Sequence, residues 1–122
     1  MTNPFNILRG EAVTETNPQL PLEERLKSLI HAAPIFLFMK GTPDAPMCGF
    51  SANVIRILDS FHLNYKSFNI LTDGDIREGL KVYSKWPTYP QLYVNGELIG
   101  GNDIVVEMLQ NGELETLLKS AQ

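Results

Sequence analysis

The chain has 122 residues, of which 43% are hydrophobic and 20% charged, and its formal net charge is −4. This length and composition are those of one ordinary globular domain with a sizeable core. The net negative charge and the lack of a basic stripe argue against nucleic acid as a partner, and no apolar run approaches the ~20 residues of a membrane span.

The chain contains a single cysteine, Cys48. One cysteine excludes an internal disulfide and a four-cysteine metal site within one chain. It favours an intracellular reducing compartment, either the cytoplasm or the mitochondrial matrix, because thiols stay free there. The segment from Met1 to Arg9 lacks the basic start and the long apolar core of a secretory signal.

The first expected elements are an arm, a helix and a strand. Residues 1–20 are rich in Thr, Asn, Pro and Glu, which predicts a flexible or loosely docked arm before a domain over residues 21–122. Apolar residues at helical spacing between Pro21 and His31 predict the first helix. The continuous apolar run over residues 34–39 predicts a central strand that is covered on both faces.

The next segment carries the cysteine. Lys40 ends the predicted strand, and a proline-rich loop over residues 41–46 leads to Cys48. An amphipathic helix is predicted from there to about Phe61. At a helix start, free N–H groups and the helix dipole favour a thiolate, the form that attacks disulfides and binds metals. The alternative is a buried and inert cysteine.

The remaining elements complete an α/β pattern. A second strand over residues 65–70 follows the helix, and this crossover implies a right-handed parallel pair. A third helix to about Ser84, with Ile76, Leu80 and Tyr83 on its buried face, precedes a hairpin centred on Asn95-Gly96. Helices over residues 102–111 and 113–119 close the chain. The pattern predicts a four-stranded mixed sheet flanked by helices.

Four separated motifs then become recognisable in order. The chain resembles the monothiol glutaredoxins of the CGFS type over roughly residues 22–119. This resemblance implies a thioredoxin fold, which agrees with the predicted order of elements. The motifs are Lys40, Cys48-Gly49-Phe50-Ser51, Trp86-Pro87-Thr88-Tyr89-Pro90-Gln91 with the strand that follows, and Gly100-Gly101-Asn102-Asp103-Ile104.

The resemblance implies that Cys48 is both the catalytic residue and the metal ligand. Ser51 stands where dithiol relatives carry a second cysteine, so no disulfide can close across this site. A [2Fe–2S] cluster usually takes four thiolates, and the family implies that two chains and two glutathione molecules supply them, giving a homodimer in the cluster-bound form. Simple glutathionylation of Cys48 is the alternative.

The resemblance also implies a glutathione site. Lys40 would bind the glycine carboxylate, Arg77 would be a second carboxylate-binding base, and a cis Tyr89-Pro90 bond would present the backbone of Tyr89. Asn102 and Asp103 would meet the γ-glutamyl end at a helix start. Without the resemblance, Lys40 and Arg77 would be ordinary surface cations and Pro90 a trans proline. Asn102 and Asp103 would then be helix caps. Tyr89 departs from the more usual aliphatic residue or phenylalanine, and Asn102 stands where many relatives have a cysteine.

The leading functional hypothesis is therefore a carrier that receives [2Fe–2S] clusters from a scaffold and passes them to iron–sulfur acceptor proteins. One alternative is an enzyme, a monothiol oxidoreductase that removes glutathione from mixed disulfides. A second alternative is a regulatory adaptor that pairs with BolA-like proteins through a shared cluster.

Overall fold

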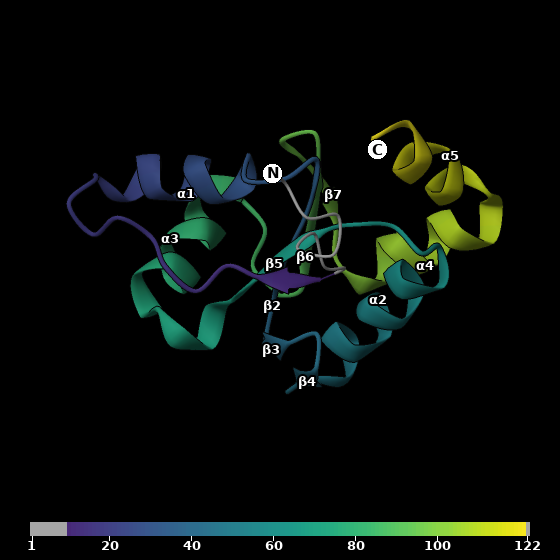
Figure 1. Cartoon of the computed structure of the whole chain (residues 1–122), viewed down its shortest axis with the longest axis horizontal. Coiled ribbons are helices and arrows are strands. Elements are labelled where there is room, and N and C mark those ends of the chain that lie inside the picture. Colours follow the sequence, from purple (N-terminus) through teal and green to yellow (C-terminus); the bar gives the residue numbers. More distant parts are fainter. Residues whose placement is uncertain (1–9, 122) are drawn as a thin grey trace, which may run out of the picture.

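The computed structural model describes residues 10–121 and shows a mixed β-sheet between two layers of helices (Figure 1). Helices α1 (Leu22–Ile30) and α3 (Gly74–Ser84) cover one face of the sheet. Helices α2 (Gly49–Ser60), α4 (Asn102–Asn111) and α5 (Glu113–Ser120) cover the other face. The first nine residues of the predicted arm lie outside the described residues.

The main sheet has the strand order β1-β5-β2-β6-β7. The central strand β2 (Ile35–Met39) runs parallel to β5 (Lys66–Asn69) and antiparallel to β6 (Gln91–Val94). Strand β6 forms a hairpin with β7 (Glu97–Gly100). The four predicted strands, the parallel pair and the hairpin are therefore confirmed.

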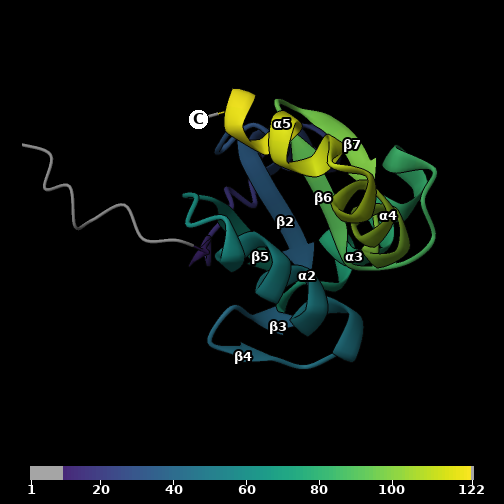
Figure 2. The same ribbon diagram turned by 90° about the vertical axis from the view of Figure 1, so that its right-hand side faces the viewer.

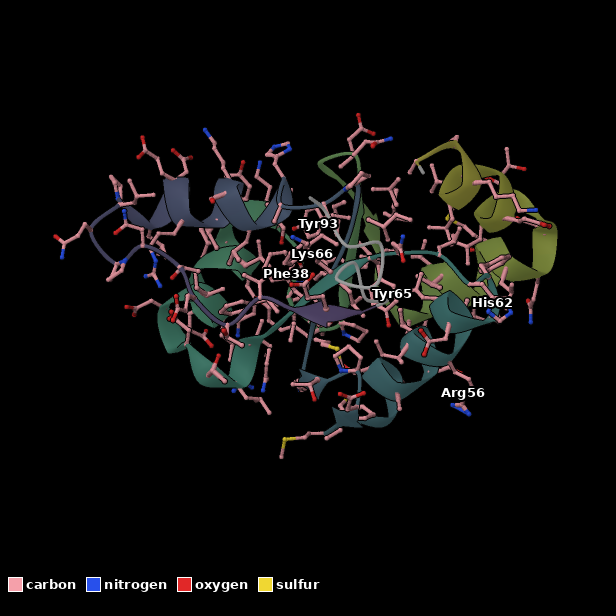
Figure 3. The ribbon with its side chains drawn as sticks, viewed as in Figure 1. Phe38, Arg56, His62, Tyr65, Lys66 and Tyr93 are labelled. Atoms are coloured by element: carbon pink, nitrogen blue, oxygen red, sulfur yellow. The ribbon has the colours of Figure 1, made fainter. Side chains whose placement is uncertain are left out.

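The central strand is buried on both faces, as its uninterrupted apolar run predicts. Phe36 and Phe38 pack toward α1 and α3, whereas Leu37 and its two neighbours on the same face pack toward α2, α4 and α5. Figure 3 shows Phe38 near Tyr93, and their rings meet edge to face with centroids 5.5 Å apart. Alternate side chains of one strand thus anchor both helical layers.

Part of the predicted arm is docked. The short strand β1 (Glu11–Ala12) pairs in parallel with β5 and makes a fifth strand. The N–H of Gly10 donates to the Tyr65 carbonyl at 2.9 Å, and the Ser67 hydroxyl donates to the Gly10 carbonyl at 3.1 Å. These bonds satisfy an edge of β5 that would otherwise be unpaired. Because the pairing uses main-chain groups, the polar composition of the arm did not indicate it.

The predicted loop before Cys48 also contains regular structure. Strand β3 (Gly41–Thr42) pairs with β4 (Ala45–Pro46) in a small antiparallel ribbon, which lies beyond the end of β2 (Figure 2). Gly41 has a φ of 92°, and a Cβ there would lie 2.5 Å from the Ala45 carbonyl oxygen. A glycine is therefore required where the chain turns away from Lys40.

The prediction that Tyr83 belongs to the buried face of α3 is wrong. Ile76 and Leu80 are fully buried, but Tyr83 is 39% exposed. Tyr83 lies in the last turn of the helix, where its ring packs partly and its polar tip stays in water. No helix among residues 10–121 is long and apolar enough to cross a membrane.

A single arginine joins the arm to two helices. Arg25 of α1 is 11% exposed, and its Nη2 lies 2.6 Å from Oδ2 of Asp73, the N-cap of α3. The same guanidinium donates to the Thr16 hydroxyl at 2.7 and 3.1 Å. Burial raises the pKa of Asp73, but the N–H of Ile76 and the charge of Arg25 outweigh burial, so this pKa lies below its ordinary value.

Replacing Arg25 by alanine should lower the free energy of unfolding by about 2 kcal/mol, because a partly buried charge-assisted hydrogen bond is lost. Urea unfolding of both proteins measures the difference. Arg56→Ala is the matched control, since Arg56 is exposed and points away from the fold (Figure 3). Equal effects of the two changes would contradict the role given to Arg25.

Asp73 should also make stability depend on pH. Its pKa is lower in the folded than in the unfolded chain, so the stabilisation is present above the unfolded value of about 3.9 and is lost as the pH falls through the folded value. Asp73→Asn keeps a good capping residue but removes the charge. We expect its free energy of unfolding to fall less steeply in acid than that of the original protein, and parallel acid profiles would refute this.

Candidate functional site

A cavity of about 470 Å³ opens beside the N-terminus of α2. Its walls come from the end of β2, the start of α2, helix α3, the segment before β6 and the start of α4. The structure brings all six residues predicted from the sequence to this one cavity. They are Lys40, Cys48, Arg77, Tyr89, Asn102 and Asp103.

Cys48 is the N-cap of α2, as predicted, and its side chain is partly exposed. The thiol makes no capping hydrogen bond of ordinary geometry, but the nearby donors favour its anion. The backbone N–H of Ser51 is the largest cause that places the pKa of Cys48 below its ordinary value. Partial burial opposes this, whereas the N–H of Phe50 and the charge of Lys40 add to it. The site therefore favours the thiolate form of Cys48, and the thiol is accessible to solvent.

Ser51 has a structural role that the sequence did not reveal. Its side chain is fully buried, and its hydroxyl oxygen accepts a hydrogen bond from the N–H of Lys40 at 3.2 Å. The same hydroxyl makes a small contribution to lowering the pKa of Cys48. Ser51 thus ties the end of β2 to the first turn of the helix that carries the thiol.

The cavity is positively charged although the whole chain is negative. Lys40, Arg77 and Lys81 line it with one carboxylate, that of Asp103, while the net charge of the chain is −4. Lys81 was not predicted, but it follows Arg77 by four residues and so lies on the same face of α3. This local excess of cations suits an anionic ligand.

The cations of α3 have weak partners. Lys81 Nζ lies 2.9 Å and Arg77 Nε 4.0 Å from carboxylate oxygens of Glu78, whose side chain is 68% exposed. Exposed ion pairs of this kind contribute little stability. Both cations can therefore exchange this neighbour for a ligand carboxylate at small cost.

A buried amide holds the segment before β6. Gln91 is fully buried, and its Nε2 donates to the carbonyls of Trp86 and Thr88 at 3.0 and 3.3 Å. Its Oε1 accepts from the Tyr93 hydroxyl at 2.8 Å. The peptide bond between Tyr89 and Pro90 is cis, as predicted. Gln91 was missed as a positioning residue, although a glutamine at the start of an apolar strand is itself an indication of a buried polar network.

Trp86 packs beside Gly101 and also lines the cavity. Its buried Nε1 has no acceptor among the described residues. A Cβ on Gly101 would lie 3.5 Å from Trp86 Nε1 and 3.1 Å from the Pro90 carbonyl oxygen. A side chain at Gly101 would therefore press on the wall of the cavity.

The start of α4 forms the opposite wall. Gly101 is its N-cap and supplies no side-chain cap, so the first-turn N–H groups face outward without side-chain acceptors from the cap. Asn102 Oδ1 accepts from Asn53 Nδ2 of α2 at 2.7 Å. The NH₂ group of Asn102 donates a long hydrogen bond to Asp103 Oδ1 at 3.5 Å, and its second hydrogen is available for another acceptor. Asn53 was not predicted, because its bond to Asn102 joins residues that are distant in sequence.

The described part of the chain offers few side chains that could hold a metal ion. Within residues 10–121, no group of three or more His, Cys, Asp or Glu side chains is placed to hold a metal ion. The sulfur donor at the cavity is the partly exposed thiol of Cys48, and the cavity also holds the Asp103 carboxylate. Such a site fits a metal group whose other ligands come from outside the chain.

Comparisons with known proteins cover most of the chain. The family model described as glutaredoxin matches residues 35–99. Glutaredoxin 3 of Danio rerio is 59% identical over 98 residues, which are 80% of this chain and 30% of that protein. An uncharacterised monothiol glutaredoxin of Synechocystis sp. is 47% identical over 105 residues, covering 86% of this chain and 96% of that protein. The chain thus spans about 30% of the length of several animal relatives.

Solved structures show the same architecture. Reduced poplar apo GrxS14 is 47% identical with a TM-score of 0.72, over 82% of this chain and 92% of that chain. A buckwheat glutaredoxin solved in complex with glutathione has a TM-score of 0.71 over 82% of this chain and 88% of that chain, and its 24% identity shows the common fold alone. The fold is the thioredoxin-like fold of glutaredoxins.

Replacing Lys40 by methionine should raise the pKa of Cys48, because a positive charge that favours the thiolate is removed. The pH dependence of alkylation by iodoacetamide measures this pKa. We expect the midpoint to move to higher pH but to stay below that of free cysteine, since the N–H of Ser51 remains. Lys119→Met on α5, outside the cavity, is the control. An unchanged midpoint in Lys40→Met would contradict the account.

Proposed function

The chain is a monothiol member of the glutaredoxin family, and from this premise we propose that it binds a [2Fe–2S] cluster with glutathione and transfers it to acceptor proteins. The observation that carries the proposal is one accessible cysteine, Cys48, in a cavity lined by cations. The cluster is cargo rather than a resident cofactor.

The number of thiolates supports a shared cluster. A [2Fe–2S] cluster usually needs four thiolates, and one copy of this chain supplies Cys48. Two copies and two glutathione molecules complete the set. Met47 and Phe50 flank the thiol and are 69% and 61% exposed, so an apolar rim is available for a second protein surface.

The cavity supports glutathione as the external thiol. Glutathione carries two carboxylates, and Lys40 and Arg77, which both line the cavity, would pair with the one at its glycine end. The cis bond before Pro90 leaves the backbone of Tyr89 at the cavity for strand-like hydrogen bonds. The first-turn N–H groups of α4, beside Asn102 and Asp103, suit the γ-glutamyl carboxylate.

The residues of this chain then have distinct tasks in transfer. The lowered pKa of Cys48 favours the thiolate, which is the form that binds a metal. An acceptor thiolate can replace Cys48 and glutathione by ligand exchange, which changes no oxidation state. Ser51 cannot trap Cys48 in a disulfide, so the ligand remains free for reloading.

The same thiolate favours a second activity, the removal of glutathione from mixed disulfides. Cys48 would attack the glutathione sulfur, form a mixed disulfide with it and release the protein thiolate. A second glutathione thiolate would then attack this disulfide, freeing Cys48 and leaving oxidised glutathione. Ser51 leaves the second step to an external thiol, which favours the carrier as the principal function.

Anaerobic reconstitution with iron, sulfide and glutathione tests the carrier proposal. We expect a coloured species that elutes from size-exclusion chromatography as a dimer, because two thiolates must come from protein. Cys48→Ser should stay colourless, and the original chain without glutathione should yield much less chromophore.

A colourless monomer under these conditions would overturn the proposal. Rapid turnover in a glutathione-coupled disulfide assay, together with failed reconstitution, would instead favour the oxidoreductase. If a coloured complex forms preferentially with a BolA-like protein rather than as a homodimer, the adaptor hypothesis would replace the homodimeric carrier.

A further inference from the structure

Tyr89 makes a contact that its sequence motif does not explain. Its side chain is 7% exposed, and its hydroxyl donates a hydrogen bond to the main-chain carbonyl of Arg77 at 2.7 Å. A carbonyl oxygen has two lone pairs, so Arg77 can accept this bond within the helix. Neither an aliphatic residue nor phenylalanine, the more usual residues at this place, offers such a donor.

We propose that Tyr89 is a positioning residue, whose hydroxyl fixes the turn of α3 that presents the Arg77 guanidinium to the carboxylate of glutathione. This inference rests on the proposed function, because it concerns the affinity of that site for its ligand. It assigns a role to the side chain of Tyr89 in addition to the role proposed for its backbone.

The bond joins two walls of one cavity. Tyr89 belongs to the segment before β6, whereas Arg77 lies on α3, and both line the cavity. The peptide part of the ligand would meet the main chain of Tyr89, and its carboxylate would meet the Arg77 side chain. The hydrogen bond from the Tyr89 hydroxyl therefore links two groups that one ligand would bind at the same time. These groups are the main chain of Tyr89 and the side chain of Arg77.

The guanidinium itself has little else to hold it. The Arg77 side chain is 41% exposed, and its carboxylate neighbour Glu78 lies 4.0 Å away and is 68% exposed. Its position therefore depends mainly on where the backbone of α3 lies. The start of α3 is held separately at the helix N-cap, where Asp73 pairs with Arg25.

The hydroxyl is suited to a permanent donor role. Burial is the main cause that raises the pKa of Tyr89 well above its ordinary value, so the group stays protonated at any physiological pH. The ring packs in the core cluster beneath α1 and α3, so phenylalanine would preserve the packing while removing the donor. Tyr89→Phe thus isolates the hydrogen bond.

The test measures binding of two probes by isothermal titration calorimetry. One is glutathione, and the other is its glycine amide, which lacks the carboxylate assigned to Arg77. We expect Tyr89→Phe to raise the Kd for glutathione by about three- to tenfold, the range of one buried hydrogen bond. Its Kd for the amide should equal that of the original chain, because the group positioned by Tyr89 has no carboxylate to bind.

Tyr65→Phe is the matched control. Tyr65 is also buried, and its hydroxyl donates to Asp59 Oδ1 at 3.3 Å, but it is not among the residues that line the cavity. This variant should bind both probes as the original chain does. In an Arg77→Gln background, Tyr89→Phe should have no further effect on the Kd for glutathione.

Each other outcome overturns the inference. Unchanged glutathione binding by Tyr89→Phe would show that the hydroxyl does not position the base. Equal weakening of both probes, or an undiminished effect in Arg77→Gln, would show that Tyr89 acts through general packing. If the original chain itself does not bind glutathione, the proposed function fails and the inference fails with it.

Discussion

The site depends on how the main chain at Lys40 is held. Its N–H donates to the Ser51 hydroxyl at 3.2 Å, and its carbonyl accepts from the N–H of Met47 at 2.9 Å. These two bonds bracket Cys48 and fix the start of α2 against the end of the central strand. The thiolate, its neighbouring cation and the cavity beside them all follow from this junction. A serine in place of a second cysteine is therefore a structural component as well as a missing thiol.

The local electrostatics differ from those of the whole chain. The net charge of −4 gives no indication of an anion site, yet the cavity gathers three cations beside the thiol. Because charges act mainly within about 8 Å in physiological salt, the three local cations matter more to a small ligand than distant carboxylates. A site for an acidic tripeptide can thus lie on an acidic protein.

The helices, strands and turns that depend on local sequence patterns could be predicted from the sequence. Apolar periodicity predicted α2, the uninterrupted run predicted β2, and Asn95-Gly96 predicted the hairpin, so the fold and the placement of Cys48 followed. The rest depends on contacts between distant segments. Strand β1 pairs through main-chain groups, Gln91 holds carbonyls behind the cavity wall, and Asn53 meets a residue on another helix. Motif resemblance gathered the six site residues, but it could not reveal the hydrogen bonds that orient them.

The central claim is that one thiolate per chain, completed by glutathione, holds a cluster between two copies. Native mass spectrometry of the anaerobically reconstituted protein tests this claim most directly, because it counts every component of one complex. We expect a mass equal to two chains, one [2Fe–2S] cluster and two glutathione molecules. A cluster-containing complex without glutathione, or with a single chain, would contradict it.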